Sequence, residues 1–197
     1  MCGIIGIVGV APVQDRLIES LKRLEYRGYD SAGIAGQVNG RLERRRAPGK
    51  LRELEAVLAD HPLNATIGIG HTRWATHGAP TERNAHPHIV GKVAVVHNGI
   101  IENFAGLRTE LEAAGVEFQS DTDSEVAVHL VAQAYRNGPT AGDFVASVLA
   151  VLRQLEGHFT LVFSNADEPG TIIAARRSTP LVVGVGDGEM FIGSDVA

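Results

Sequence analysis

Segments typical of β-strands and segments typical of helices come in separate groups along this chain, and this grouping constrains the fold most. Short apolar runs of strand length occupy residues 2–9, 32–38, 42–46, 66–72, 92–96, 158–164, 171–175, 181–185 and 190–193. Apolar residues recur at helical spacing in residues 17–24, 51–59, 107–114, 122–136 and 141–155. Grouped strands favour antiparallel sheets with helices packed outside them. The sequence therefore predicts an α+β fold.

Local patterns refine this prediction. Asn39-Gly40 lies between two strand-like runs and predicts a hairpin turn. Thr122 followed by Glu125 has the form of a capping box, which predicts a helix that opens there and runs to Arg136. Residues 74–91 are rich in His, Pro, Thr and Asn without any periodicity, so we expect a long loop. Loops of this length in a compact domain are often functional.

Composition excludes several classes of protein. The 197 residues suffice for one domain with a substantial core, and 44% of them are hydrophobic. A formal net charge of −5 provides no positive field for a polyanion, so we expect no nucleic-acid partner. The triplet Arg44-Arg45-Arg46 is expected on a solvated face. One cysteine excludes an internal disulfide framework, and nothing resembles a secretory signal or a membrane span. These features predict a cytoplasmic protein with no membrane partner.

Cys2 is the only cysteine, within the opening "MCGIIGIVG". It would become the first residue if Met1 were removed, and its thiol would then lie beside a free α-amine. Such an amine has a pKa of about 7.7–8.0 and can accept the thiol proton near neutral pH. The alternative is that Cys2 is a small apolar residue packed in the first strand, and position alone favours this alternative.

Two further motifs carry charged residues suited to an amino acid. Arg73, in "HTRWATHG", supplies a rigid fork of donors for a carboxylate, and Trp74 could cover a ligand. Asp123, in "SDTDSEV", could bind an ammonium group. The alternatives are a surface ion pair for Arg73, a core position for Trp74, and an acid that complements a helix dipole for Asp123. Together Arg73 and Asp123 describe a site for a free amino acid.

The motif "VVHNG" admits two interpretations. The side-chain amide of Asn98 and the backbone N–H of Gly99 could form an oxyanion hole, in which two adjacent donors stabilise one negatively charged oxygen. The alternative is a type I′ hairpin turn, which an Asn-Gly pair after an apolar strand commonly forms.

The histidines raise the possibility of a metal hydrolase. Five of the eight lie between His71 and His97. The sequence lacks the His-Glu-x-x-His pattern, and a single cysteine cannot build a thiolate metal site. We therefore expect no metal and no other cofactor.

Six segments in order, "MCGIIGIVG", "LEYRGYDSAGIA", "HTRWATHG", "NAHPH", "VVHNGIIEN" and "SDTDSEV", resemble the glutaminase domains of glucosamine-6-phosphate synthases. These enzymes are also called glutamine–fructose-6-phosphate aminotransferases (isomerising). The resemblance extends from Met1 to at least Asp195. Each motif is weak alone, but the ordered set is highly specific.

The resemblance implies an N-terminal-nucleophile hydrolase fold, a four-layer αββα sandwich in which two antiparallel sheets face each other. It implies that Cys2 attacks the side-chain amide of L-glutamine. It also implies that Arg73 binds the glutamine carboxylate and that Asp123 binds its amino group. By the same resemblance, Asn98 and Gly99 form the oxyanion hole, and Arg27 supports the surroundings of the nucleophile. The resemblance further implies a loop that closes over the substrate and contains Trp74, Thr76 and His77.

Two other interpretations of the function remain open. An amidophosphoribosyltransferase-like enzyme would share the glutaminase chemistry with a different acceptor, and a non-catalytic amino-acid-binding module could use the same Arg73 and Asp123. Enzymes of the resembled family carry two sugar-isomerase domains. We therefore expect residues 1–197 to be a type 2 glutamine amidotransferase domain, trimmed at its C-terminal end, from a homo-oligomeric parent. Fructose-6-phosphate would bind only to the isomerase domains.

Overall fold

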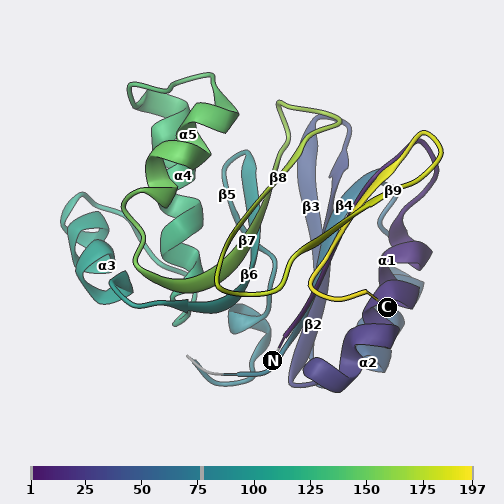
Figure 1. The fold of residues 1–197 in the computed structure, drawn as a ribbon. Helices are drawn as coiled ribbons and strands as arrows, with labels where there is room; N and C mark the ends of the chain where they lie inside the picture. Colours follow the sequence, from purple (N-terminus) through teal and green to yellow (C-terminus); the bar gives the residue numbers. More distant parts are fainter. Residues whose placement is uncertain (1, 76–77, 197) are drawn as a thin grey trace.

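The computed structural model describes residues 2–75 and 78–196, in which two antiparallel sheets face each other (Figure 1). The first sheet contains, in spatial order, β3 (Arg41–Pro48), β2 (Ser31–Val38), β4 (Ile67–Arg73), β1 (Gly3–Val8), β10 (Met190–Gly193) and β9 (Val182–Val185). The second contains β5 (His88–Val90), β6 (Val93–Ile101), β7 (Gly157–Asn165) and β8 (Ile172–Arg177).

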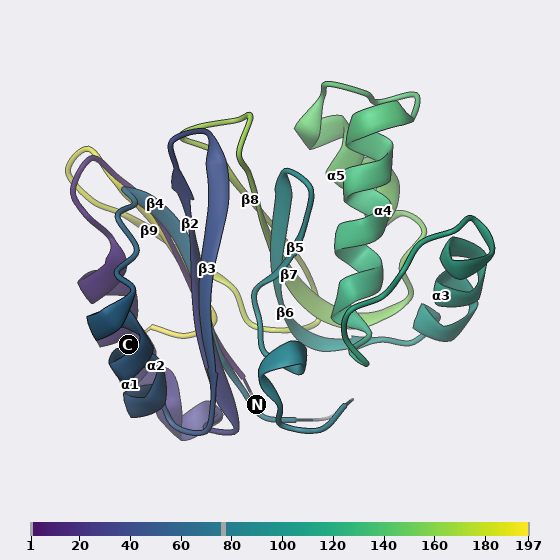
Figure 2. The same ribbon diagram turned by 180° about the vertical axis from the view of Figure 1, so that it is seen from behind.

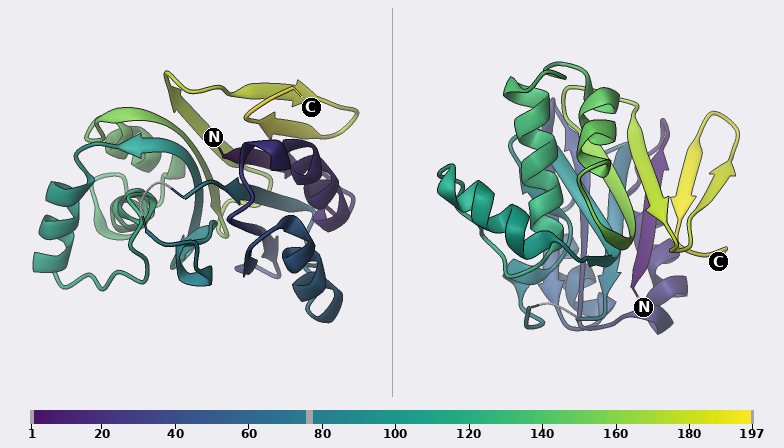
Figure 3. Two further views of the ribbon diagram at one scale, coloured as in Figure 1. Left: turned by 90° about the horizontal axis from the view of Figure 1, so that it is seen from below. Right: turned by 60° about the vertical axis from the view of Figure 1, so that its left-hand side comes forward.

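Helices cover the outer face of each sheet, as the view from behind also shows (Figure 2). The first sheet is covered by α1 (Gln14–Leu24) and α2 (Leu51–Asp60). The second carries α3 (Phe104–Ala113), α4 (Ser124–Asn137) and α5 (Phe144–Leu152) on its side of the molecule. Seen from below, the two groups of helices lie on opposite sides of the paired sheets (Figure 3). The predicted α+β class and the four-layer αββα arrangement are confirmed.

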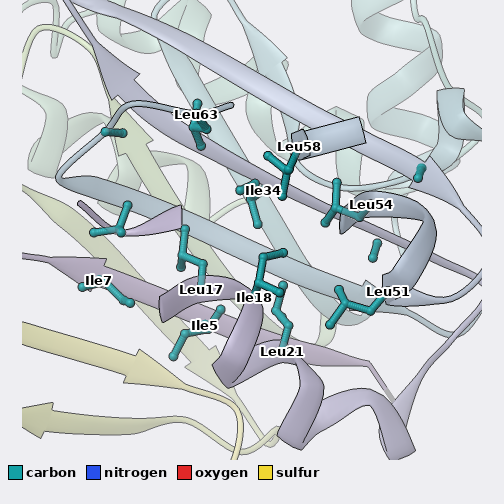
Figure 4. Close-up of a cluster of buried hydrophobic side chains, with 14 residues drawn as sticks. Ile5, Ile7, Leu17, Ile18, Leu21, Ile34, Leu51, Leu54, Leu58 and Leu63 are labelled. Carbon is teal, nitrogen blue, oxygen red and sulfur yellow. The ribbon is translucent and has the colours of Figure 1, made fainter. Parts of the chain in front are cut away.

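Three apolar layers hold these elements together. The first layer lies between α1, α2 and the first sheet, where Leu17 and Leu54 are fully buried (Figure 4). A second cluster packs α4 and α5 against the second sheet. The third joins the two sheets and includes Ile4, whereas Ile5 belongs to the first layer. Successive side chains of β1 thus enter opposite layers, which explains why its sequence is an uninterrupted apolar run.

The tight turns follow their sequence signals. Asn39 and Gly40 have positive φ values of 49° and 71° and connect β2 to β3, so the predicted hairpin is confirmed. The predicted long loop at 74–91 is partly wrong, because it contains a short 3₁₀ helix, η2 (Glu82–Asn84), and strand β5. β5 forms because it pairs with the start of β6 across a turn at Gly91.

The predicted capping box is wrong. Helix α4 begins at Ser124, and the side chain of Asp123 at its N-cap makes no capping hydrogen bond. The Glu125 carboxylate instead accepts hydrogen bonds from the backbone N–H groups of Gln119 (2.8 Å) and Ser120 (2.6 Å). Glu125 therefore anchors the loop before the helix.

The expectation of a solvated face for Arg44-Arg45-Arg46 is only partly met, because all three residues are half-buried. The guanidinium of Arg46 donates to the carbonyl oxygen of Ala85 at 2.8 Å, because the segment around η2 folds over β3. Burial lowers the pKa of Arg46 to about 10.

Within the described residues, no helix combines the length and the apolar character needed to cross a membrane.

Candidate active site

Cys2 immediately precedes β1, which pairs with β4 so that Gly3 faces Thr72. This register brings the thiol to the end of β4. The backbone N–H of Trp74 donates to the Cys2 sulfur at 3.1 Å, and the sulfur lies 3.6 Å from the carbonyl oxygen of the same residue. Burial raises the pKa of the Cys2 thiol, and the hydrogen bond from Trp74 opposes this shift. A base is therefore needed to form the thiolate near neutral pH.

The thiol opens into a cavity of about 280 Å³, a volume suited to a small ligand. Its lining contains all the predicted site residues that the structure describes, namely Cys2, Arg27, Arg73, Trp74, Asn98, Gly99 and Asp123. Thr76 and His77 lie outside the described residues. Segments widely separated along the chain therefore meet at one cavity.

Arg73 is the last residue of β4 and is only 3% exposed. Its guanidinium donates to the carbonyl oxygens of Gly78 (2.9 Å) and Ala79 (3.1 Å). Burial lowers its pKa, while the nearby Asp123 acts in the opposite direction. Because arginine stays protonated in proteins, this side chain places a positive charge at the cavity wall. It is not the exposed surface ion pair considered above.

Asp123 is 4% exposed and lines the same cavity. One carboxylate oxygen, Oδ2, accepts a hydrogen bond of 2.8 Å from the backbone N–H of Ile101. The other, Oδ1, lies 3.4 Å from the Ser124 hydroxyl and 3.9 Å from Nδ1 of His97. The carboxylate is thus held in place by β6 and by its own helix. The cavity therefore carries a cation and an anion, as a zwitterionic ligand requires.

Asn98 and Gly99 do not form a hairpin. They lie within β6 and pair with Thr160 and Phe159 of β7. Gly99 has a φ of +116°, and a Cβ atom there would overlap the carbonyl oxygen of His158, so only glycine fits this position. The competing hairpin interpretation is therefore wrong.

The side-chain amide of Asn98 bridges the two sheets. Its nitrogen, Nδ2, donates to the carbonyl oxygen of Cys2 at 2.8 Å, and its oxygen, Oδ1, lies 3.0 Å from Nε2 of His71. An amide nitrogen carries two hydrogens, and the bond to Cys2 uses one of them. The second leaves Asn98 with a donor for a ligand in the cavity.

Aromatic and charged side chains complete the rim. Trp74 is 44% exposed, so it is not a core residue, and its ring meets Tyr29 edge to face at 5.3 Å. Arg27 forms an ion pair with Asp195 at 2.7 Å and a hydrogen bond with the Tyr26 hydroxyl at 3.1 Å. These contacts place Arg27 at the cavity wall beside the segment that contains Cys2.

Several site residues escaped the sequence analysis. The Asp30 carboxylate accepts a hydrogen bond of 2.8 Å from the backbone N–H of Ala75, next to Trp74. Its place in "LEYRGYDSAGIA" could have identified it. Thr179 and Pro180 line the cavity itself, but no sequence pattern marks them. Among the described residues, no group of three or more His, Cys, Asp or Glu side chains is placed to hold a metal ion.

Comparison with known proteins assigns the family. A profile of the glutamine amidotransferase domain matches residues 71–197. The chain belongs to the glutamine amidotransferase family. This amidotransferase chain is 70% identical to a glutamine–fructose-6-phosphate aminotransferase (isomerizing) of Mycolicibacterium paratuberculosis, over 100% of its own length and 32% of the relative's. It is 62% identical to the enzyme of that name from Caulobacter vibrioides, over 99% of its own length and 32% of the relative's.

Two solved structures are also similar to this chain over almost its whole length. A glutamine phosphoribosylpyrophosphate amidotransferase from B. subtilis aligns with a TM-score of 0.81 and 25% identity, over 98% of this amidotransferase chain and 42% of the other. A structure described as the allosteric regulatory enzyme of purine biosynthesis aligns with a TM-score of 0.85 and 26% identity, over 98% and 42% of the two chains. The chain spans about a third of the length of the curated relatives it matches.

Proposed function

We propose that this chain hydrolyses the side-chain amide of L-glutamine to glutamate and ammonia, with Cys2 as the nucleophile. The observation that carries the proposal is the convergence of a thiol, an amide donor and two opposite charges on one cavity of about 280 Å³. Arg73 would bind the α-carboxylate and Asp123 the α-ammonium. The side-chain amide of the substrate would then extend towards Cys2.

The reaction would proceed through a thioester. The Cys2 thiol gives its proton to a base, and its sulfur attacks the carbon of the substrate amide. The resulting oxyanion would accept hydrogen bonds from the side-chain amide of Asn98 and the backbone N–H of Gly99. Ammonia leaves once its nitrogen has gained that proton, and water then hydrolyses the thioester to glutamate. The base we propose is the α-amine of Cys2, available once Met1 has been removed.

The remaining site residues would shape and close the cavity. Trp74 would cover the bound substrate, and Arg27 would hold the wall near the nucleophile. A closing role for Thr76 and His77 stays a prediction, since both lie outside the described residues.

The activity of the whole protein is a further proposal. The high identity to glutamine–fructose-6-phosphate aminotransferases supports a parent enzyme in which the ammonia converts fructose-6-phosphate to glucosamine-6-phosphate. The much lower identity to phosphoribosylpyrophosphate amidotransferase disfavours the phosphoribosyl alternative. We also propose that residues 1–197 are the glutaminase part of a cytoplasmic, homo-oligomeric enzyme whose sugar-isomerase domains are separate from this segment.

The decisive experiment measures glutamate release from L-glutamine by protein whose first residue is Cys2, with removal of Met1 verified by mass spectrometry. Calorimetry with L-glutamine runs in parallel. Turnover, together with covalent addition of 6-diazo-5-oxo-norleucine at Cys2, supports the proposal. Glutamine binding without any glutamate release would identify a non-catalytic amino-acid-binding module instead.

A further inference from the structure

His71 is a buried imidazole next to the proposed oxyanion hole. It lies on β4 of the first sheet and is 1% exposed. Its Nε2 atom lies 2.9 Å from the backbone carbonyl oxygen of His97 and 3.0 Å from Oδ1 of Asn98, both on β6 of the second sheet. A single ring nitrogen therefore contacts two oxygen atoms across the interface between the sheets.

The contacts assign the tautomer of His71. A carbonyl oxygen and an amide oxygen are both acceptors, so Nε2 must carry the hydrogen. The other ring nitrogen, Nδ1, has no hydrogen-bond partner among the described residues. Burial lowers the pKa of His71 to about 3, although the hydrogen bonds to His97 and Asn98 act in the opposite direction. The ring is therefore neutral near pH 7 and acts as a single N–H donor.

This donor determines which way the Asn98 amide faces. In the observed orientation Oδ1 accepts from His71, while Nδ2 donates to the carbonyl oxygen of Cys2 at 2.8 Å. If the amide were rotated by half a turn, an N–H would face the N–H of His71 and an oxygen would face the Cys2 oxygen. Both contacts would be repulsive. His71 and Cys2 together allow only the orientation that keeps Nδ2 on the side of the thiol.

We propose that His71 is a positioning residue that orients the oxyanion donor of Asn98 by donating a hydrogen bond to its amide oxygen. The proposal rests on the proposed function, because it assigns to Asn98 a role in glutamine hydrolysis. His71 does not act as the base in this proposal, because an imidazole with a pKa of about 3 is a poor proton acceptor near neutral pH.

Two substitutions of His71 test whether its Nε2–H group, and not the rest of the ring, is what Asn98 requires. His71→Leu removes the N–H, and kcat for glutamine hydrolysis should fall roughly 10- to 100-fold. This decrease should not exceed the decrease in kcat caused by removing an entire oxyanion donor. The KM for glutamine should change little, because the defect affects the transition state. His71→Gln places an amide N–H near the position of Nε2, so it should recover most of the lost kcat.

Coupling to Asn98 gives the sharpest kinetic result. If His71 acts through Asn98, the double variant His71→Leu/Asn98→Ala should be no slower than Asn98→Ala alone. If the double variant instead loses kcat by the product of the two single fold-losses, the proposal is overturned. A His71→Leu protein with wild-type kcat would overturn it as well.

Thr72→Val is the matched control. It is the next residue on β4, is 1% exposed, and its hydroxyl lies on the face towards Leu24, so kcat should not change.

A measurement without turnover keeps this inference separate from the proposed function. The side-chain N–H₂ resonances of Asn98 should exchange with water at least about tenfold faster in His71→Leu than in the wild type, because the amide is released. Unchanged exchange overturns the positioning role, even in a protein that is an active glutaminase. Faster exchange in a protein that never releases glutamate supports the positioning role, while the proposed function fails.

Discussion

The side-chain amide of Asn98 donates a hydrogen bond of 2.8 Å to the carbonyl oxygen of Cys2, although 96 residues separate the two in the sequence. Cys2 precedes β1 of the first sheet, and Asn98 lies within β6 of the second. This bond therefore joins the two sheets at the thiol. It also holds the Asn98 amide beside Cys2, where the proposed oxyanion would form.

Replacement of Asn98 by alanine should lower kcat for glutamine hydrolysis by roughly 10²–10³, with a smaller effect on KM, because the lost donor matters most as negative charge develops. Steady-state kinetics and thermal unfolding of the same preparation test this. Asn64→Ala, at an exposed position, is the control and should leave kcat unchanged. A less stable Asn98→Ala protein with normal kcat would show that the residue has only a structural role.

Replacement of Cys2 by alanine should abolish glutamate release while leaving the fold intact, because the reaction then has no nucleophile. Cys2→Ser should be nearly inactive too, since a hydroxyl is much harder to deprotonate than a thiol near neutral pH. A glutamate assay and circular dichroism check both variants. Substantial turnover by Cys2→Ala would contradict the mechanism.

Arg73→Ala and Asp123→Ala, and also Arg73→Lys, should act mainly on substrate binding. Loss of one partner of a buried charged contact costs roughly 2–5 kcal/mol, which corresponds to an increase in KM of at least about 30-fold. A lysine ammonium cannot reproduce the planar fork of Arg73. The control is Asp121→Asn in the same motif, an exposed carboxylate that pairs with Arg83 at 3.0 Å.

The charges of Arg73 and Asp123 should also make simple amides poor substrates. A primary amide that lacks the α-carboxylate and α-ammonium groups offers nothing to Arg73 or Asp123, so the wild type should hydrolyse it poorly. Comparison of kcat/KM for glutamine and for such an amide tests this directly. Equal values would mean that the assigned roles are wrong.

Protein that retains Met1 should be inactive as a glutaminase. With Met1 in place, the nitrogen of Cys2 is an amide without useful basicity, whereas a free α-amine has a pKa of about 7.7–8.0. Burial raises the pKa of the Cys2 thiol, so the thiolate is scarce without a base. Glutamate release is measured before and after treatment with methionine aminopeptidase, with mass spectrometry to confirm cleavage. Equal activity of both forms would show that another group is the base.

Glu125→Gln should destabilise the fold in a pH-dependent manner. Burial disfavours the charge of Glu125, but hydrogen bonds from His129, Ser120 and the backbone of Gln119 outweigh burial and lower the pKa of Glu125 to about 2. The stabilising contribution is therefore complete above the unfolded-state pKa of about 4.3 and is lost as the pH falls towards 2. Near pH 7 the variant should lose roughly 1–3 kcal/mol of unfolding free energy.

Denaturant unfolding at several pH values tests this expectation. The difference between the wild type and Glu125→Gln should shrink as the pH falls below about 4. The control is Asp167→Asn, which removes an exposed ion pair with Lys92 and should cost less than about 1 kcal/mol. A difference for Glu125→Gln that does not depend on pH would contradict the assigned pKa.

Patterns within short stretches of the sequence determined the elements and the types of residue at the site. The continuous apolar run of β1 indicated a strand buried on both faces, and Asn39-Gly40 predicted the turn that connects β2 to β3. Such patterns are readable because strand burial and turn geometry depend on near neighbours. The pairing of Arg73 with Asp123 indicated a site for a free amino acid, whereas Cys2 was recognisable as a candidate nucleophile only together with the other motifs.

Only the tertiary structure decided how these residues are used. Asn98-Gly99 continues a strand because β7 supplies its pairing partners, although the dipeptide alone favours a turn. The orientation of the Asn98 amide depends on His71, which lies on the other sheet, and on Cys2, which precedes a strand of that sheet. Contacts between segments distant in the sequence depend on how the sheets pack, and no local pattern encodes that packing.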